Sequence, residues 1–186
     1  GKSPDLGRRL EKWDTLPYYI RNEDNSIKEW NFWGGDLPGI TEKLGYIKSL
    51  GASMIYLNPI FAARSNHRYD TADYFKIDPM LGTEEDFTEL CKKAKELGIR
   101  IILDGVFNHT GVESKYYKEH PDWYLKDGDS VKCWWGVRDL PEVDGNNPEF
   151  SEMICGEDGV LKYWLKKGAS GWRLDVADEL PDSFMK

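Results

Sequence analysis

The stretch from Gly98 to Gly111, GIRIILDGVFNHTG, decides the fold. A mostly apolar run over 99–103 ends in Asp104, and Asn108, His109 and Thr110 follow within six residues. A short apolar run of this kind is typical of a fully buried strand. A core needs none of these polar side chains, so they either cap a turn or face a ligand.

The same pattern occurs three times along the chain. An amphipathic helix ends in lysine and glycine and is followed by a short apolar strand, in YIKSLGASMIYLNP, KAKELGIRIILDG and WLKKGASGWRLDV. We expect strands near 52–57, 100–104 and 171–175. Strands that alternate with helices predict an α/β fold with a parallel sheet and right-handed crossovers. Ligands bind at the carboxyl ends of such strands, where Asn58, Asp104 and Asp175 are placed.

Capping signals predict where the helices begin and end. Thr83 and Asp86 form a capping-box pattern before the second helix, and Gly98 stands where a C-terminal cap belongs. The first helix is expected near 40–50. The third is expected to start after Asn147-Pro148 and to reach about Lys167, with glycines 156 and 159 as breaks.

Composition excludes several classes of protein. The net charge of the 186 residues is −8, which argues against nucleic acid as a partner. No apolar run approaches the ~20 residues of a membrane helix, so we expect no membrane span. Three cysteines without tight spacing favour a reduced compartment, and the expected location is cytoplasmic.

Two connections, 58–82 and 105–147, are long for a compact domain, and such loops are usually functional. They are rich in Trp, Tyr, Asn and Asp. Flat aromatic rings beside amides and carboxylates suit a polyhydroxylated sugar ring, whose C–H face stacks while its hydroxyls form hydrogen bonds.

The third strand carries charges. Side chains alternate along a strand, so Arg173 and Asp175 share one face while Trp172 and Leu174 share the other. One interpretation is a structural ion pair. The other is a carboxylate whose pKa is lowered by the guanidinium, and which is thereby kept ready as a nucleophile.

Taken together, these motifs resemble the α-amylase family, glycoside hydrolase family thirteen. The resemblance rests on DGVFNHT at 104–110, GWRLDVADE at 171–179 and LPEVD at 140–144. IYLNPIF at 55–61 and SNHRYDTADYFKIDP at 65–79 are most similar to the cyclomaltodextrinase, neopullulanase and maltogenic-amylase branch. The similarity extends from about Trp33 onward.

The resemblance implies a partial (β/α)8 TIM barrel containing about strands 2–4 of 8, with a small inserted B-type subdomain. Residues 1–108 and 148–186 would belong to the catalytic barrel, and residues 109–147 would form the insertion. A complete barrel needs ~250 residues. The chain therefore reads as a fragment of the catalytic domain.

The resemblance also implies residue roles. Asp175 would be the catalytic nucleophile that forms a β-glycosyl-enzyme intermediate, and Arg173 would orient it. His109 would bond a hydroxyl of the sugar before the scissile bond, and Tyr69 would stack on that sugar. Asp104 would be a buried scaffold carboxylate near Arg173.

Four further residues have supporting roles by the same resemblance. His67 and Asp70 would shape the wall beside Tyr69, and Asp178 and Glu179 would line the leaving-group side. No cofactor is required. A calcium ion held by oxygens of Asn108 and Glu142 remains open, since the position of a further ligand, usually histidine, is Glu179 here.

The expected function is that of a retaining α-glucan hydrolase or transglycosidase. Its substrates would be α-1,4 or α-1,6 glucosidic bonds of starch-derived oligosaccharides or cyclodextrins. The alternative is a non-catalytic, carbohydrate-binding homologue, which need not keep Asp175, Arg173 and His109. A metal-dependent hydrolase using His67, His109 and Asp175 lacks tight ligand spacing.

Retaining hydrolysis needs a second carboxyl group about 5 Å from the nucleophile. The family's general acid follows a later strand, and no motif for it occurs in these residues. We therefore expect this chain alone to be inactive, and to self-associate through exposed barrel edges.

Overall fold

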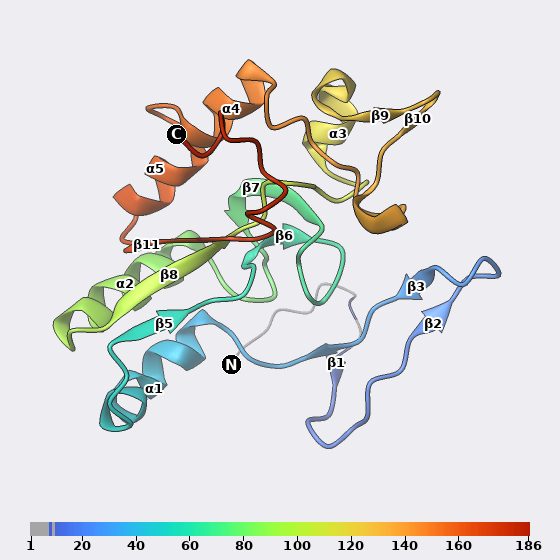
Figure 1. Ribbon diagram of the computed structural model, residues 1–186. Helices are drawn as coiled ribbons and strands as arrows, with labels where there is room; N and C mark the ends of the chain where they lie inside the picture. Colours follow the sequence, from blue (N-terminus) through green and yellow to red (C-terminus); the bar gives the residue numbers. More distant parts are fainter. Residues whose placement is uncertain (1–7, 9) are drawn as a thin grey trace.

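A computed structural model describes residue 8 and residues 10–186 of the chain. At its centre, three parallel strands lie in the order β11–β8–β5 (Figure 1). They are β5 (Met54–Tyr56), β8 (Arg100–Gly105) and β11 (Gly171–Leu174). The register places Ile55 beside Ile101 and Arg173 beside Asp104. The predicted strands and their parallel pairing are confirmed.

The helices accompany these strands as the repeat predicts. They are α1 (Leu37–Ser49), α2 (Glu84–Glu96), α4 (Pro148–Cys155) and α5 (Val160–Lys166). Asp36 caps α1 and Asn147 caps α4, each by accepting hydrogen bonds from backbone N–H groups of the first turn. The predicted third helix is thus divided into α4 and α5, and the break spans the two glycines.

Helix α2 begins with the predicted capping box. The Thr83 hydroxyl accepts from the Asp86 backbone N–H at 3.2 Å, and the Asp86 carboxylate accepts from the Thr83 N–H at 2.8 Å. These two bonds satisfy donors that a helix N-terminus otherwise leaves free. The start of α2 is therefore fixed by local sequence.

Glycines bound the stretch GIRIILDGVFNHTG for two different backbone reasons. Gly98 follows α2 with a φ of +67°, a conformation that glycine adopts without strain. Gly111 has no room for a side chain, because a Cβ there would stand 2.5 Å from the carbonyl oxygen of Asp70. Its N–H donates to the Thr71 carbonyl at 3.0 Å. The stretch thus starts at a helix end and finishes against a neighbouring segment.

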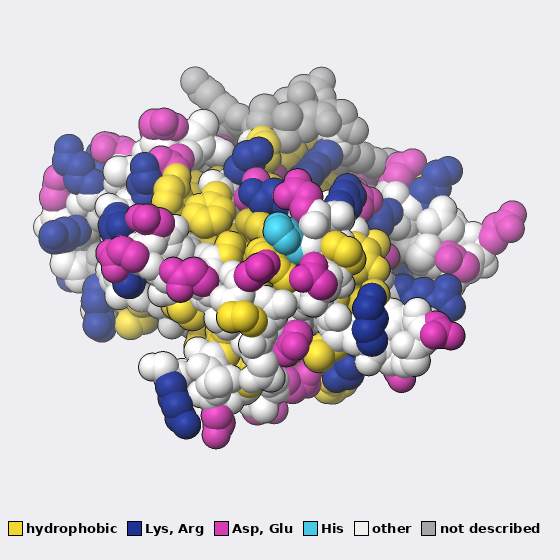
Figure 2. Space-filling model, turned by 90° about the horizontal axis from the view of Figure 1, so that it is seen from above, with side chains coloured by type: hydrophobic (Ala, Val, Ile, Leu, Met, Phe, Trp, Pro, Cys, Tyr) yellow, Lys and Arg dark blue, Asp and Glu magenta, His cyan; other side chains and the backbone are white. Residues whose placement is uncertain are grey.

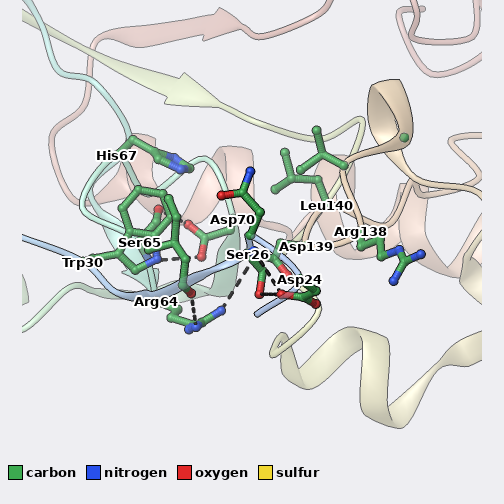
Figure 3. A pocket seen from close by; sticks show the side chains of 14 residues that line it. Asp24, Ser26, Trp30, Arg64, Ser65, His67, Asp70, Arg138, Asp139 and Leu140 are labelled. Atoms are coloured by element: carbon green, nitrogen blue, oxygen red, sulfur yellow. Dashed lines mark hydrogen bonds and ion pairs between the residues drawn. The ribbon is translucent and has the colours of Figure 1, made fainter. Parts of the chain in front are cut away.

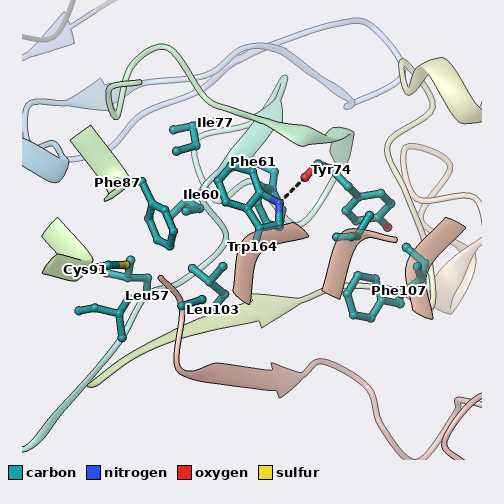
Figure 4. Packing of buried hydrophobic residues seen from close by; sticks show 14 of the residues in the cluster. Leu57, Ile60, Phe61, Tyr74, Ile77, Phe87, Cys91, Leu103, Phe107 and Trp164 are labelled. Carbon is teal, nitrogen blue, oxygen red and sulfur yellow. Dashed lines mark hydrogen bonds between the residues drawn. The ribbon is translucent and has the colours of Figure 1, made fainter. Parts of the chain in front are cut away.

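The hydrophobic core lies between the sheet and its helices and is dominated by aromatic rings (Figure 4). Trp164 of α5 is fully buried, and its ring lies 5.3 Å from Phe61 and 5.3 Å from Phe87. Its indole N–H donates to the Tyr74 carbonyl at 2.8 Å. A buried tryptophan needs such a partner for its polar atom.

The connection 58–82 contains structure that the sequence analysis described only as a loop. Strands β6 (Phe61–Ala63) and β7 (Thr71–Ile77) pair in an antiparallel manner with register shifts. Thr71 and Asp73 are buried in β7, so apolar and polar residues do not alternate cleanly there. A half-buried strand is recognised by strict alternation of apolar and polar residues, and the buried polar residues of β7 break that alternation.

The N-terminal part folds as two small strand pairs. Strand β1 (Leu10–Glu11) runs parallel to β4 (Phe32–Trp33), and β2 (Ile20–Arg21) forms a hairpin with β3 (Ile27–Glu29). In Figure 1 this hairpin extends away from the central sheet.

Residues 109–147 form several short elements. They are α3 (Lys115–Glu119), β9 (Lys126–Asp127), β10 (Ser130–Val131) and the 3-10 turns η1 (Pro121–Trp123) and η2 (Trp134–Gly136). Strands β9 and β10 form a hairpin through Gly128, whose φ is +60°. The tight turn expected at 126–130 is therefore present. The assignment of 109–147 as a separate subdomain stays a prediction.

The segment is anchored to the end of β8. A β-bridge joins His109 to Glu142, and the Val143 N–H donates to the Asn108 carbonyl at 2.9 Å. Within the described part of the chain, no helix is long and apolar enough to cross a membrane.

Candidate functional site

The site is organised by Arg173 at the end of β11. Its Nη1 donates to Asp104 Oδ1 at 2.9 Å and to Asp175 Oδ1 at 2.5 Å. On the opposite face of the strand, Trp172 lies 6.1 Å from the core ring of Phe61. The predicted alternation along this strand is confirmed, and one cation lies between two carboxylates.

Asp104 is the most enclosed member of this group. Its side chain has no exposure to solvent. Besides the bond from Arg173, its Oδ2 accepts from the hydroxyls of Tyr56 and of Tyr69, the latter at 3.1 Å. Both carboxylate oxygens therefore accept at least one hydrogen bond, as a buried carboxylate requires.

Tyr56 was missed by the sequence analysis. It lies in β5, and its hydroxyl bonds to Asp104 on the neighbouring strand β8. The sequence offered one signal: Tyr56 carries a hydroxyl and lies in the first repeat strand, two residues before Asn58. Burial and the bond to the Asp104 carboxylate raise the pKa of the Tyr56 hydroxyl, so it remains a donor.

Asp175 has only 9% of its surface exposed. Burial raises its pKa above the ordinary value. The hydrogen bond and charge of Arg173 oppose this rise, and the nearby Asp104 charge adds to it. The expectation that the guanidinium lowers the pKa of Asp175 was therefore wrong in net direction, because removal from water outweighs the ion pair.

A strained backbone follows Asp175. Val176 has a φ of +50°, which is an outlier for a β-branched residue. The conformation is held from both sides, since the Asp175 N–H donates to the Gly105 carbonyl and the Glu179 N–H donates to the Val176 carbonyl, each at 3.0 Å. Such strain persists where the surroundings over-determine it, and it is frequent at functional sites.

His109 is buried with 1% exposure and stacks on Trp134, with 5.0 Å between the ring centroids. Neither ring nitrogen has a hydrogen-bond partner among the described residues. Burial lowers its pKa to about 4, so the imidazole is neutral at pH 7. A neutral imidazole offers one donor and one acceptor, which suits a sugar hydroxyl.

Tyr69, His67 and Asp70, three of the four residues of the 67–70 turn, have different surroundings. Tyr69 joins the Asp104 network, and its ring lies 6.0 Å from His67. Asp70 is buried, and both of its oxygens accept from Ser65, one from the N–H at 3.1 Å and one from the hydroxyl. Asp70 therefore shapes the turn through Ser65.

Asp178 and Glu179 lie outside the network of Arg173. Both are exposed, and Glu179 accepts a bond from the Trp135 indole N–H at 3.4 Å. Glu179 lines a cavity of about 380 Å³ together with Asn108 and Glu142. Seen from above, this end of the molecule mixes acidic, basic and hydrophobic side chains around a histidine (Figure 2).

The residues expected to hold calcium fit that ion poorly. Glu142 is almost fully buried, and its carboxylate already pairs with Lys132, with 2.6 Å between Oε2 and Nζ. Among the described residues, no three His, Cys, Asp or Glu side chains are grouped to hold a metal. The negative charge of Glu142 is therefore already compensated by an ammonium group.

The comparisons with known proteins agree with this geometry. The family model for the α-amylase catalytic domain matches residues 14–153. The chain belongs to the α-amylase catalytic-domain family. Together with the structure, this shows that the three parallel strands are part of a TIM barrel, as expected from the motifs.

Individual relatives include hydrolases of α-glucans. An amylopullulanase of Thermoanaerobacterium saccharolyticum is 44% identical, over 92% of this chain and 17% of its own length. An intracellular maltogenic amylase of Bacillus subtilis is 40% identical, over 95% of this chain and 32% of its own. A solved cyclic α-maltosyl-(1→6)-maltose hydrolase of Arthrobacter globiformis has a TM-score of 0.79 and 33% identity, over 98% and 43%. The chain spans less than half the length of these relatives.

The buried state of His109 predicts a pH dependence of stability. Its folded pKa of about 4 lies below 6.5, the usual value for histidine, so the unfolded chain binds the proton first as the pH falls. The free energy of unfolding should decrease from pH 6.5 to pH 4, by up to about 3 kcal/mol from this group.

Urea unfolding at several pH values checks this prediction. Because other groups also titrate, the comparison is between the wild type and His109→Gln. The variant should show a flatter dependence between pH 6.5 and pH 4, whatever its stability at pH 7. Identical slopes for the two proteins would contradict the assignment.

Proposed function

We propose that this chain is part of a retaining α-glucan hydrolase or transglycosidase, acting on α-1,4 or α-1,6 bonds of starch-derived oligosaccharides or cyclodextrins. The observation that carries the proposal is the bridge from Arg173 to Asp104 and Asp175. It holds one carboxylate, Asp175, at the strand end with part of its surface open to a ligand.

In the proposed reaction, an Asp175 oxygen attacks the anomeric carbon and the bond from that carbon to the glycosidic oxygen breaks. The leaving oxygen takes a proton from a second carboxylic acid. Water, or another sugar hydroxyl, then gives its proton to the carboxylate left by the first step and attacks the same carbon, which releases Asp175 and retains the configuration. Arg173 keeps the attacking carboxylate oriented while its charge changes.

The remaining roles follow the resemblance and the contacts described above. Tyr69 stacks on the sugar that is attacked, and His109 bonds one of its hydroxyls. His67 and Asp70 form the adjoining wall. Asp178 and Glu179 line the leaving-group side, where both are exposed.

Trapping the intermediate tests the proposal. A 2-fluoro-glucosyl or fluoromaltosyl fluoride, which has a good leaving group, should label the intact protein on the peptide that contains Asp175, as seen by mass spectrometry. Asp175→Asn should remain unlabelled. A homologue that only binds carbohydrate would show no label, which would refute the proposal.

The pH dependence of labelling adds a second readout. Attack needs ionised Asp175, so the rate should fall as the pH falls through its pKa. Burial raises that pKa, so the fall should begin at higher pH than for an exposed aspartate. Arg173→Gln removes the opposing effect and should move the fall further upward.

We also propose that the 186-residue chain alone does not turn over natural substrates. Asp104 accepts bonds from Arg173, Tyr56 and Tyr69, which leaves it no role as proton donor to a leaving group. Absence of general-acid help typically costs 10²–10⁴-fold. Purified chain should leave maltooligosaccharides and cyclodextrin intact. Hydrolysis that disappears in Asp175→Ala would overturn this proposal.

Calcium independence is a further proposal, supported by the pairing of Lys132 with Glu142. The thermal midpoint of the chain should be unchanged by EDTA or by millimolar calcium. Lys132→Ala leaves the buried Glu142 carboxylate unpaired, so it should lower the midpoint, whereas Lys132→Arg should keep most of it. A midpoint that EDTA lowers and calcium restores would contradict the proposal.

Two finer expectations are also kept as proposals. We propose a cytoplasmic location, supported by the unpaired state of all three cysteines. Self-association is supported by the side chains along the outer edge of the sheet, where Met54 and Tyr56 of β5 are each 43% exposed.

A further inference from the structure

A cavity of about 730 Å³ lies at the amino ends of the three central strands, away from the carboxylates of the site. Ser53 stands directly before β5, Arg100 begins β8 and Ser170 stands directly before β11. The remaining lining comes from α2, from the end of α5 and from the turn that follows each helix. The volume falls in the range of small-molecule pockets, about 300–1,000 Å³.

The charges in this lining are all positive. They belong to Lys92, Lys95, Arg100, Lys166 and Lys167, and no carboxylate of the described residues lines the cavity. The cavity shown in Figure 3, by contrast, has three carboxylates beside two guanidiniums in its lining. The whole chain has a net charge of −8, so composition alone does not account for a concentration of positive charge at this place.

Lysines near the end of a helix often serve the free carbonyls of its last turn. Here backbone N–H groups already bond to such carbonyls. At the end of α2 the N–H groups of Gly98 and Ile99 donate at 3.0 and 2.8 Å, and at the end of α5 those of Gly168 and Ala169 donate at 3.0 and 3.1 Å. Arg100, moreover, lies on a strand. Helix capping therefore leaves the positive charges of the cavity unexplained.

Three of the five cations have no anionic partner. Within the described part of the chain, no carboxylate forms an ion pair with Lys92, Lys95 or Arg100. The other two cations pair with carboxylates that lie outside the lining. Like charges that share a cavity repel one another, so an anion that enters it is attracted by several side chains at once.

The floor of the cavity is apolar and uncharged. Cys91, Ile99 and Ala169 line it and are buried. Burial raises the pKa of the Cys91 thiol to about 12, so no thiolate adds negative charge at pH 7. Ser53 and Ser170 add hydroxyls at exposed positions of the lining. Cationic walls, hydroxyls and an apolar floor suit an anion that carries an organic part.

We infer that this cavity binds a small organic phosphate, with the phosphate group held by Arg100, Lys92 and Lys95 and the organic part on the apolar floor. A guanidinium offers paired donors to phosphate oxygens, and ammonium groups add point charges. Arg100 and Asp104 stand at opposite ends of β8, so this ligand is not the sugar that Asp175 attacks. The inference is therefore independent of the proposed function.

Calorimetry on the 186-residue chain at pH 7 tests the inference, with glucose 6-phosphate as the probe. Glucose 6-phosphate should bind, inorganic phosphate should bind more weakly, and glucose should not bind. Arg100→Gln and Lys92→Gln should each weaken binding about tenfold, as expected for the loss of one charge-assisted hydrogen bond. Lys118→Gln removes the same charge from an exposed position outside the cavity and should leave binding unchanged.

A substitution at Leu165 separates loss of the site from loss of folding. Leu165 lines the cavity and is 42% exposed, so a polar side chain there leaves the core undisturbed. Leu165→Glu places a carboxylate among the cations and should abolish binding. Leu165→Gln has nearly the same size without the charge and should keep it.

Several results would overturn the inference. One is a wild-type chain that does not bind glucose 6-phosphate, and another is binding that Arg100→Gln, Lys92→Gln and Leu165→Glu leave intact. An equal loss in Lys118→Gln would mean that the surface attracts anions without a site. Inorganic phosphate that binds as tightly as glucose 6-phosphate would refute the assignment of an organic phosphate. Labelling of Asp175, or its failure, affects none of these outcomes.

Discussion

A single guanidinium nitrogen between two carboxylates is the interaction on which the site depends. Asp104 and Asp175 end adjacent strands, and without a cation between them their charges would repel in a region largely removed from water. Arg173 can reach both only because it is paired with Asp104 in the register of β8 and β11. A slip of one residue would turn Arg173 toward the core and Trp172 toward the face that now carries Arg173. Strand register and site chemistry are therefore one constraint.

Asp104 connects all three strands of the sheet through hydrogen bonds to its carboxylate. It receives bonds from β5 through Tyr56, from β11 through Arg173 and from the 67–70 turn through Tyr69. Each donor comes from a different segment, so the carboxylate fixes their relative positions. A buried polar network of this kind is rigid when all its members are satisfied, and removal of one member exposes the others to the cost of desolvation.

The local features of the chain could be read from its sequence. The capping box at Thr83, the glycine after α2 and the alternation around Arg173 each depend on a few adjacent residues, and each is present. Tyr56 and the β6–β7 hairpin could not be read in this way. Their signals depend on partners far along the chain, the carboxylate of Asp104 in one case and a buried polar strand in the other.

The pKa of Asp175 also depends on features of the folded chain that the sequence does not show. The sequence identifies its neighbour Arg173, which lowers the pKa, and the resemblance places Asp104 nearby, but neither gives the burial of Asp175, which raises the pKa most. Only the folded chain decides which effect is larger.

The segment 109–147 is held at the end of β8 by a backbone bridge and contains an ion pair of its own. Glu142 bridges to His109 through the backbone, and its buried carboxylate pairs with Lys132, whose side chain is half exposed. His109 is thereby held in place by its neighbours in the fold, while its own ring nitrogens stay free of protein partners among the described residues. The Asp175 carboxylate is thus positioned by Arg173, whereas His109 is positioned by its backbone bridge to Glu142 and its stack on Trp134.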